Sequence, residues 1–348
     1  MKNINPYKRL CNTRLPALIV FIVLVVYVES TAQQNLLWYE QPAADWNEAL
    51  PIGNGRLGAM IFGGVQSERL QLNEESVWTG RPIDFVNPEA KAALPLVRQL
   101  LFEGKYAEAQ QLAQHKMMGD KKVHSTYQTL GDLYLRFDAT TTIQQYKRSL
   151  DLATAVASVT YTSGNVTFMR ESFSSAPDQV VVTRLTASQQ KSISFTLNLS
   201  RPGNHAEFAT LGNDELIMRE HVGNGVGVTL VARVKVLHEG GRIEILGSEI
   251  RITAANAVTI LLAAATDYAC GDPAVVSERH IKNAGSKSYA QLKARHIKDY
   301  QQYFNRVTFL LGTGDTLPMP TDERLTNFRN GKSDRELIAL YYQFGRYL

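Results

Sequence analysis

The feature that most constrains this chain is a long succession of short segments with the composition of strands between residues 127 and 267. In several of them, at residues 133–137, 156–161 and 166–171, apolar and polar side chains alternate. An alternation with a period of two is typical of a strand that buries one face. The segments are residues 133–137, 156–161, 166–171, 180–185, 193–199, 216–219, 228–237, 243–246, 250–252 and 257–265. Turn-forming residues such as Gly164 and Asn165 separate them, and no helical pattern lies between them. The pattern therefore predicts a large antiparallel β-sandwich and argues against a doubly wound α/β fold.

A second informative stretch, residues 46–82, precedes these segments. Its Gly and Asn residues at 53–55 favour a tight turn, and the runs at 57–62 and 68–72 have the composition of strands. The loop that follows gathers amide, carboxylate and aromatic side chains, a mixture that suits the hydroxyl groups and the C–H face of a sugar. The alternative for each single residue, such as Asn73 or Trp78, is that it only holds down an edge of the sandwich.

The N-terminus has the organisation of a secretory signal peptide. Four basic residues precede an apolar run at residues 15–28, and small residues follow it up to Ala32. The run is shorter than the roughly 20 apolar residues of a membrane-spanning helix, so we expect cleavage after Ala32 and no membrane association afterwards. The protein would then be secreted or periplasmic. Cys270 would be its one cysteine, and a single thiol forms no intrachain disulfide.

Charge and motif spacing exclude several classes of function. Without residues 1–32 the chain keeps 33 basic and 32 acidic residues, a formal net charge of +1, which argues against nucleic acid as a partner. The seven histidines are dispersed and no paired cysteines accompany them, so no metal site is expected. Gly53, Gly55 and Gly58 have the spacing of a dinucleotide-binding motif. However, they precede a strand where that motif opens a helix, so no cofactor is expected.

Two helical regions accompany the predicted strands. Residues 88–118 predict an αα-hairpin inserted into the sandwich, with an apolar stripe for core packing. Residues 272–320 predict a helical linker that ends in a strand at residues 309–312. Residues 321–348 predict further helices, and the last of them is apolar on most sides, as a helix inside a larger helical domain would be.

Several motifs together resemble glycoside hydrolase family 95, the α-L-fucosidases. They are ALPIGNGRLGAMIFGGVQSERLQLNEESVWTGRP at residues 49–82, YQTLGDLYLRF at 127–137, RESFSSAPDQVVVTRL at 170–185 and LYYQFGRYL at 340–348. The resemblance implies an N-terminal β-sandwich, a helical linker, an (α/α)6-barrel catalytic domain and a C-terminal β-domain. It also implies inverting hydrolysis of terminal α-L-fucose, with α-1,2 linkages favoured, on a fucosylated glycan. The chain would then comprise a signal peptide (1–32), a sandwich domain (33–271), a linker (272–320) and the start of a truncated barrel (321–348).

The resemblance places the acidic catalytic group and the Asn and Asp residues that activate water beyond residue 348, so no catalytic residue is expected in this chain. An inverting glycosidase needs two carboxyl groups about 6.5–9.5 Å apart. Glu74 and Glu75 cannot supply them, since adjacent residues of an extended chain face opposite sides. We therefore expect this chain to be inactive alone, with the missing catalytic barrel as its partner.

In an intact enzyme, loops of the sandwich would shape the pocket or meet the barrel. Trp78 is the strongest candidate, because a large ring with a paired N–H is typical of an interface. The residues proposed for a substrate pocket or domain interface are Asn54, Asn73, Glu74, Trp78, Arg81, Tyr127 and Gln128. Three alternatives remain open: a non-catalytic glycan-binding module, an α-L-galactosidase of the same family, and a relation to other enzymes that pair a large sandwich with an (α/α)6 barrel, such as disaccharide phosphorylases.

Overall fold

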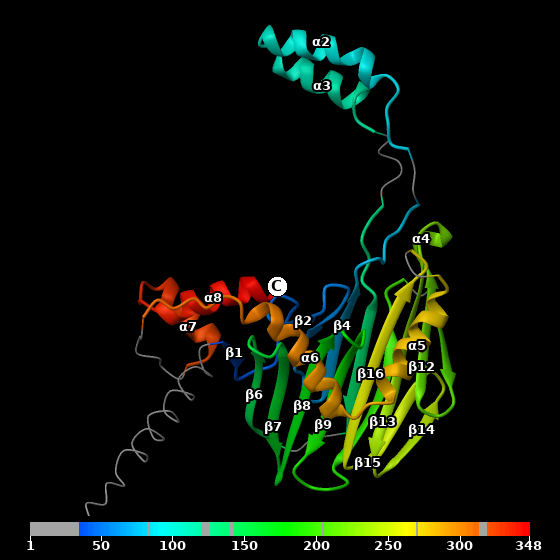
Figure 1. Ribbon diagram of the computed structural model, residues 1–348, viewed down its shortest axis with the longest axis vertical. Helices are drawn as coiled ribbons and strands as arrows, with labels where there is room; N and C mark the ends of the chain where they lie inside the picture. Colours follow the sequence, from blue (N-terminus) through cyan, green and yellow to red (C-terminus); the bar gives the residue numbers. More distant parts are fainter. Residues whose placement is uncertain are drawn as a thin grey trace, which may run out of the picture.

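The computed structural model describes residues 35–81, 84–119, 125–138, 142–203, 205–268, 271–312 and 319–348. The predicted signal peptide and Cys270 lie outside the described residues. Two large sheets pack face to face, with helices on the outside of one sheet and at one end of the sandwich (Figure 1). The predicted fold class, a mainly β protein with a large antiparallel sandwich and helices after it, is confirmed.

The larger sheet has nine strands. In spatial order they are β1 (Leu36–Tyr39), β6 (Ile143–Asp151), β7 (Val156–Ser163), β8 (Val166–Ser175), β9 (Val180–Ala187), β16 (Ala257–Thr266), β13 (Thr229–Glu239), β12 (Glu215–His221) and β11 (Glu207–Leu211). The smaller sheet has seven strands, in the order β14 (Arg242–Leu246), β15 (Glu249–Ala255), β10 (Ile193–Ser200), β5 (Gly131–Phe137), β4 (Ser67–Glu74), β3 (Leu57–Ile61) and β2 (Leu50–Gly53). The second informative stretch of the sequence, residues 46–82, therefore contributes one edge of the smaller sheet.

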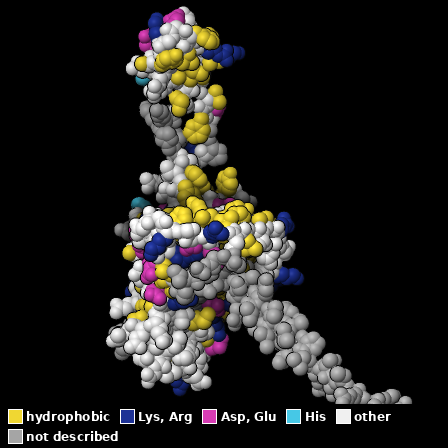
Figure 2. All heavy atoms as spheres, turned by 90° about the vertical axis from the view of Figure 1, so that its left-hand side faces the viewer, with side chains coloured by type: hydrophobic (Ala, Val, Ile, Leu, Met, Phe, Trp, Pro, Cys, Tyr) yellow, Lys and Arg dark blue, Asp and Glu magenta, His cyan; other side chains and the backbone are white. Residues whose placement is uncertain are grey.

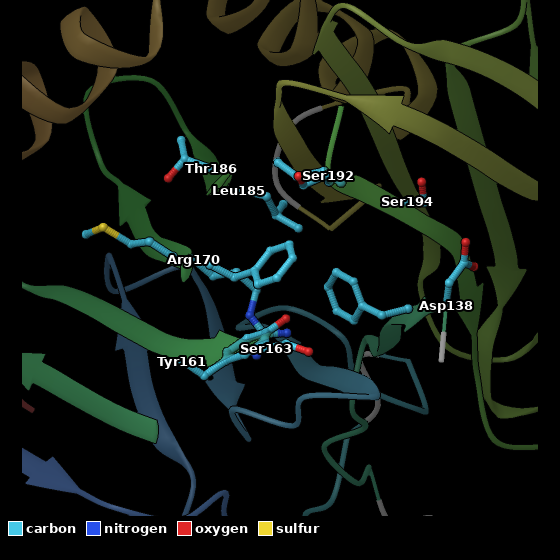
Figure 3. A pocket seen from close by; sticks show the side chains of 12 residues that line it. Asp138, Tyr161, Ser163, Arg170, Leu185, Thr186, Ser192 and Ser194 are labelled. Atoms are coloured by element: carbon cyan, nitrogen blue, oxygen red, sulfur yellow. The ribbon is translucent and has the colours of Figure 1, made fainter. Parts of the chain in front are cut away.

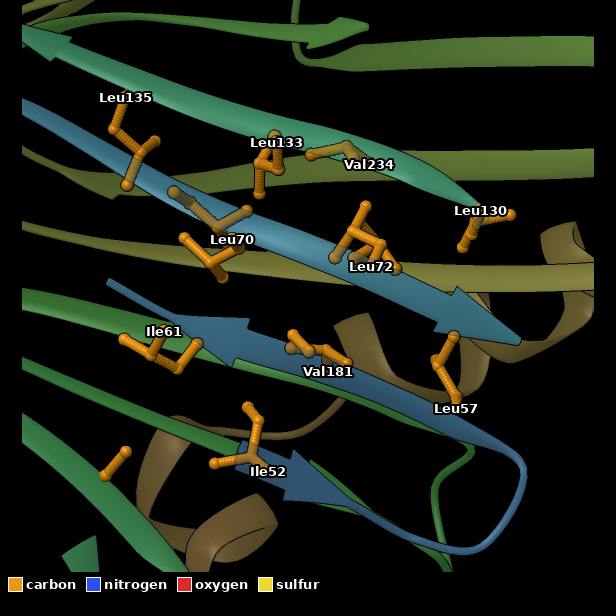
Figure 4. Packing of buried hydrophobic residues seen from close by; sticks show 14 of the residues in the cluster. Ile52, Leu57, Ile61, Leu70, Leu72, Leu130, Leu133, Leu135, Val181 and Val234 are labelled. Atoms are coloured by element: carbon orange, nitrogen blue, oxygen red, sulfur yellow. The ribbon is translucent and has the colours of Figure 1, made fainter. Parts of the chain in front are cut away.

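The main core lies between the two sheets. Alternate residues of β4, among them Leu70 and Leu72, are buried, as are Leu133 and Leu135 of the neighbouring strand β5. They pack with residues of the larger sheet such as Val234 of β13 (Figure 4). The period-two pattern of the sequence thus corresponds to one buried face on each sheet.

Strand β16 is buried along its whole length, because both of its faces are covered. One face belongs to the main core, and helices α5 (Pro273–Gly285) and α6 (Tyr289–Phe304) lie against the other side of the sheet (Figure 1). Leu261 of β16, Ile281 of α5 and Leu292 of α6 share this second core. A strand buried on both faces reads as a continuous apolar run, which explains the sequence of residues 257–265.

The inserted hairpin consists of α2 (Ala90–Phe102) and α3 (Tyr106–Lys116), which pack on each other. It projects beyond the end of the sandwich (Figure 1). In the described part of the hairpin only Val97 and Ala109 are buried, whereas Tyr106, which belongs to the predicted stripe, is 69% exposed. The expectation that its apolar stripe packs in the core is therefore wrong, since the stripe is used mainly between the two helices.

The last helices, α7 (Thr321–Arg329) and α8 (Arg335–Tyr347), lie beside β1 and β2 (Figure 1). One face of α8 packs on the core through Leu337 and Leu340, and the Tyr347 hydroxyl donates a hydrogen bond of 2.7 Å to the Pro51 carbonyl. The strand predicted at residues 309–312 is absent, because these residues pair with no strand. Within the described residues, no helix has the length and apolar character needed to cross a membrane.

Candidate functional site

The loop after β4 is fixed to the segment that returns from the helical hairpin. Trp78 and Tyr127 form an antiparallel bridge. On either side of it, the Thr79 amide donates to the Thr126 carbonyl at 2.9 Å, and the Gln128 amide donates to the Val77 carbonyl at 2.9 Å. Residues 77–79 and 126–128 therefore form a short ladder that closes the base of the insertion.

Glu74 holds the start of this loop from inside the protein. Its side chain is 3% exposed, and one carboxylate oxygen accepts from Arg56 Nη1 at 3.0 Å. The other accepts from the amide and the hydroxyl of Ser76, at 2.8 and 2.6 Å. The Ser76 hydroxyl lies 2.5 Å from the Thr266 hydroxyl of β16, so the network joins the two sheets. This carboxylate is engaged in structure and is not free to act as an acid or base.

Trp78 and Tyr127 place two half-exposed rings at the rim. Their ring centroids are 5.5 Å apart, and the side chains are 44% and 43% exposed. The polar tip of each ring is bonded, since Trp78 Nε1 donates to the Glu75 carbonyl at 3.0 Å and the Tyr127 hydroxyl donates to Asn73 Oδ1 at 3.3 Å. Burial, with smaller effects of the neighbouring glutamates, raises the pKa of Tyr127, which therefore stays protonated. The pair offers apolar ring surface in a fixed orientation.

A glycine-rich loop between β12 and β13 packs against the backbone of Trp78 and Thr79. It contains the short helix α4 (Val222–Gly225), and the Val228 amide donates to the Trp78 carbonyl at 3.3 Å. A Cβ atom on Gly227 would lie 2.6 Å from the Trp78 carbonyl oxygen and 2.9 Å from the Thr79 Cα atom. Glycine is thus required by close approach of two backbones. A run of Gly and Asn residues predicts a turn, but nothing in the run indicates this contact.

Beside this loop lies a cleft of about 1220 Å3. Its walls include Arg56, Glu74, Trp78 and, from α5, Arg279 and His280. Two buried polar atoms in these walls, Arg56 Nη2 and His280 Nδ1, have no hydrogen-bond partner among the described residues. Burial and the nearby charges of Arg56 and Arg279 lower the pKa of His280, which keeps its imidazole neutral at pH 7. The cleft thus combines aromatic surface with unsatisfied hydrogen-bonding groups.

The structure places the seven predicted residues unequally. Glu74, Trp78 and Arg81 line the cleft. Asn73 and Tyr127 are not among its lining residues, but the Tyr127 ring packs on Trp78 and its hydroxyl donates to Asn73. Gln128 lies instead in a neighbouring depression of about 620 Å3, which also includes Thr79 and Arg201.

Asn54 lies away from the cleft and acts as a turn residue. Its side-chain oxygen accepts from the amides of Arg56 and Leu57, at 3.1 and 2.8 Å. Conversely, Arg279 and His280 were not predicted, because they reach the cleft from a helix some two hundred residues away in sequence. No local motif marks such residues.

Glu74 and Glu75 both border the cleft. This differs from the expectation that adjacent residues face opposite sides, and the reason is that β4 ends at Glu74 and the chain turns there. Because the Glu74 carboxylate is buried and bonded, the two residues still do not provide a pair of free carboxyl groups. Among the described residues, no group of three or more His, Cys, Asp or Glu side chains is arranged to hold a metal ion.

The fold is a large two-sheet sandwich whose following helices pack on one outer face. The chain shares it with a solved structure titled as a putative kojibiose phosphorylase from human microbiome. The TM-score is 0.50 and the identity 11%, over 78% of this chain and 38% of that one. At this identity the likeness concerns the fold alone.

The family is shown by sequence. Residues 37–271 match the N-terminal domain of glycosyl hydrolase family 65, and residues 288–348 match the catalytic domain of glycosyl hydrolase family 95. The chain therefore belongs to the glycosyl hydrolases, with a family 65-type N-terminal domain followed by a family 95 segment. The resemblance to family 95 stated from the motifs is confirmed.

Curated relatives agree with this assignment. Alpha-L-fucosidase 2 of Arabidopsis thaliana is 35% identical, over 90% of this chain and 41% of the relative. Probable alpha-fucosidase A of Aspergillus niger is 29% identical, over 91% and 43%, and that of Aspergillus oryzae is 27% identical, over 94% and 48%. The chain thus spans less than half the length of the curated relatives that it matches.

Proposed function

We propose that this chain is the N-terminal part of an exo-acting α-L-fucosidase that removes terminal, α-1,2-linked L-fucose from glycans with inversion. In this proposal the signal peptide is cleaved after Ala32 and the protein is secreted or periplasmic. The observation that carries the proposal is the relative named alpha-L-fucosidase 2, together with the family 95 match of residues 288–348. The bonded state of the Glu74 carboxylate supports the further expectation that the catalytic groups lie in another domain.

The cleft is proposed as the part of the sandwich that borders the catalytic domain and the glycan. The half-exposed rings of Trp78 and Tyr127 supply surface for the C–H face of a sugar, and the polar residues Arg56 and His280 lie in the cleft walls beside Trp78. Helix α8, within the family 95 segment, leaves Tyr341 77% exposed, as expected of a helix that a larger helical domain covers. Figure 2, which looks onto the side where α7 and α8 lie, shows hydrophobic side chains in a band across this face.

Fucose release tests the activity. The chain alone and the chain joined to a complete family 95 catalytic domain, in the arrangement of its relatives, would be given 2′-fucosyllactose, 3-fucosyllactose and an α-L-galactosyl analogue. We expect no release by the chain alone and fastest release from the α-1,2 linkage by the joined protein. Release by the chain alone would overturn its proposed inactivity, and a folded joined protein that prefers the galactosyl analogue would support the alternative specificity.

The role of the cleft is tested by Trp78→Ala in the joined protein. The matched control is Trp46→Ala, because Trp46 is 51% exposed and lies outside the cleft. We expect kcat/KM to fall about tenfold or more in the Trp78 variant, which corresponds to ~1.4 kcal/mol of transition-state stabilisation. The control should keep its kcat/KM. If the Trp78 variant lost only thermal stability and kept kcat/KM, Trp78 would be a structural residue.

A further inference from the structure

A third cavity, of about 260 Å3, lies between the two sheets at the opposite end of the sandwich from the Trp78 loop. Tyr161, Arg170 and Leu185 of the larger sheet and Ser194 of the smaller one surround it (Figure 3). The volume is just below the range of about 300–1,000 Å3 that holds drug-sized ligands. The cavity is therefore of a size for one small ring and not for an oligosaccharide.

One wall is a buried arginine with an unused donor. Arg170 is 4% exposed, its Nη2 donates to the Gly64 carbonyl at 2.7 Å, and its Nη1 lies 3.2 Å from a carboxylate oxygen of Glu68. Its Nε and Nη1 atoms make no hydrogen bond among the described residues, but both atoms are buried. The guanidinium therefore supports the wall, and because the ion pair with Glu68 balances its charge, it adds no net positive charge to the cavity. Asp138, the carboxylate that lines the cavity, is likewise balanced, because it accepts two bonds of 2.7 Å from Arg251.

Aromatic rings form the second kind of wall. Tyr161 and Phe168 stack with their centroids 5.3 Å apart and an interplanar angle of 20°. The Arg170 guanidinium carbon lies 5.2 Å from the centroid of Phe137. Tyr161 is 2% exposed, whereas Phe168 is only partly buried. Phe168 is therefore the ring of this pair that the C–H groups of a sugar can contact, while the sugar hydroxyls bond to polar neighbours.

Hydroxyl groups complete the lining. Ser194 accepts a bond of 2.9 Å from the Ala254 amide, and its own proton is left for an acceptor. Ser192 makes one long bond of 3.4 Å to the Gln190 carbonyl, and Thr186 adds a third hydroxyl to the wall. Each of these hydroxyl groups can both donate and accept a hydrogen bond, and so can each hydroxyl group of a sugar, so the two can pair in either direction.

We propose that this cavity is an auxiliary carbohydrate site that binds one ring of an uncharged sugar. It lies at the other end of the strands from the cleft and shares no lining residue with it. The site would hold a glycan on the sandwich without taking part in hydrolysis. The proposal does not rest on fucosidase activity, because binding can be measured on this chain alone.

Ligand-detected NMR on the chain tests the site, with L-fucose, D-galactose and D-glucose as neutral probes and D-glucuronate as the charged comparison. We expect millimolar binding of at least one neutral sugar and weaker binding of glucuronate. The blocking variant is Ser192→Trp, which fills the cavity with an indole ring. Its matched control is Gln190→Trp, which adds the same ring to the same exposed loop outside the cavity. We expect saturation transfer to fall at least fivefold in the first variant and to be unchanged in the second.

Two further variants separate this site from the cleft and from misfolding. Phe168→Ala removes an aromatic wall from a partly exposed position and should weaken binding several-fold while the chain stays folded. Trp78→Ala alters the cleft and should leave this binding unchanged. The proposal is overturned if none of the neutral probes binds, if glucuronate binds more tightly, or if binding survives Ser192→Trp but is lost in Trp78→Ala.

Discussion

At the scale of single residues, Glu74 connects most of the groups that shape the cleft. It bonds the Arg56 guanidinium on one side and the Ser76 amide and hydroxyl on the other. Arg56 in turn donates to Gln179 Oε1 at 2.6 Å and to the Ala264 carbonyl at 2.8 Å. Removal of this carboxylate would therefore leave a partly buried guanidinium and a backbone amide without their acceptor.

We predict that Glu74→Ala lowers the free energy of unfolding by about 2–4 kcal/mol, the usual effect of breaking a buried, hydrogen-bonded ion pair from one side. The matched control is Glu75→Ala, because Glu75 is the exposed neighbour in the same loop and should change stability by less than about 0.5 kcal/mol. Urea denaturation of both variants measures the difference. Equal stability of the two would show that the Glu74 network contributes nothing to the fold.

At the scale of secondary-structure elements, the α4 loop and the Trp78 loop form one unit although about 145 residues separate them in sequence. Gly227 lets the two backbones approach, and the Trp78 carbonyl accepts from the Val228 amide. The position of Trp78 therefore depends on the α4 loop, which contacts the Trp78 loop through the backbone of Gly227.

We predict that Gly227→Ala moves the Trp78 loop and lowers the free energy of unfolding by about 1–3 kcal/mol, the effect of overpacking. Gly53→Ala is the matched control, because a Cβ atom at Gly53 meets nothing within 4 Å. Hydrogen exchange of residues 75–81, measured together with urea denaturation, should be faster in the Gly227 variant and unchanged in the control. Unchanged exchange in both variants would contradict a supporting role of the α4 loop.

The junction of α7 and α8 depends on one carboxylate. Asp334 receives two bonds of 2.8 Å from Arg324 and caps α8 by accepting from the Leu337 amide at 2.8 Å. The hydrogen bonds from Arg324, opposed by burial and helped by the helix amide, lower the pKa of Asp334. A lowered carboxyl pKa stabilises the fold above the ordinary value of about 3.9, and this contribution is lost as the pH falls through the lower folded-state pKa.

We predict that the amides of α7 and α8 lose protection relative to the sandwich as the pH falls below about 4. Asp334→Asn retains a capping side chain but loses the charge opposite Arg324, so its protection should be reduced at pH 7 and should depend less on pH. Asp272→Asn, the same change at the α5 N-cap, is the matched control, since Asp272 accepts from the Ala274 amide. If both variants showed the same pH dependence of amide protection as the unchanged chain, the ion pair of Asp334 with Arg324 would not stabilise α7 and α8.

The elements themselves were largely predictable from sequence, for reasons that particular residues illustrate. Leu133 and Leu135 alternate with polar residues because one face of β5 is buried. The run at residues 309–312 has the same apolar composition but no strand beside it, so it forms no strand. Some apolar hairpin residues predicted to be in the core, such as Leu101 and Tyr106, are exposed because the insertion leaves the sandwich. The composition of a segment determines its preference for strand or helix. Whether the segment forms that structure depends on whether another strand or helix lies beside it.

The candidate site was less predictable than the strands. Trp78 was found because an aromatic residue in a polar loop is unusual by itself. His280 and Gln179 were not found, because only the packing of α5 and of the β8–β9 turn brings them to the same cleft. Asn54 was predicted for the pocket or interface but is a turn residue. Its side-chain oxygen accepts hydrogen bonds from two backbone amides, and this accounts for an asparagine at this position without any ligand.

At the scale of the whole molecule, the central strand β16 is buried on both of its faces, whereas helix α8 leaves apolar side chains exposed to solvent. Helix α8 buries Leu337, Leu340 and Gln343 against the sandwich and neighbouring helices, so it is firmly attached along one side. Its other side exposes Ile338 by 42% and Tyr341 by 77%. Contiguous apolar surface of this kind on a soluble protein promotes association.

We predict that the chain by itself self-associates through α8, and that the double variant Ile338→Ser, Tyr341→Ser reduces this association. Both positions are exposed, so the change should remove apolar surface without creating a cavity. Gly345→Ser is the matched control, because it places a serine on an exposed position of the same helix and a Cβ atom there meets nothing within 4 Å. Light scattering coupled to size-exclusion chromatography should give a lower apparent mass for the double variant than for the control at equal concentration. Because the core face of α8 is unchanged, both proteins should unfold at the same urea concentration. If the double variant associated as strongly as the control, the associating surface would not be α8.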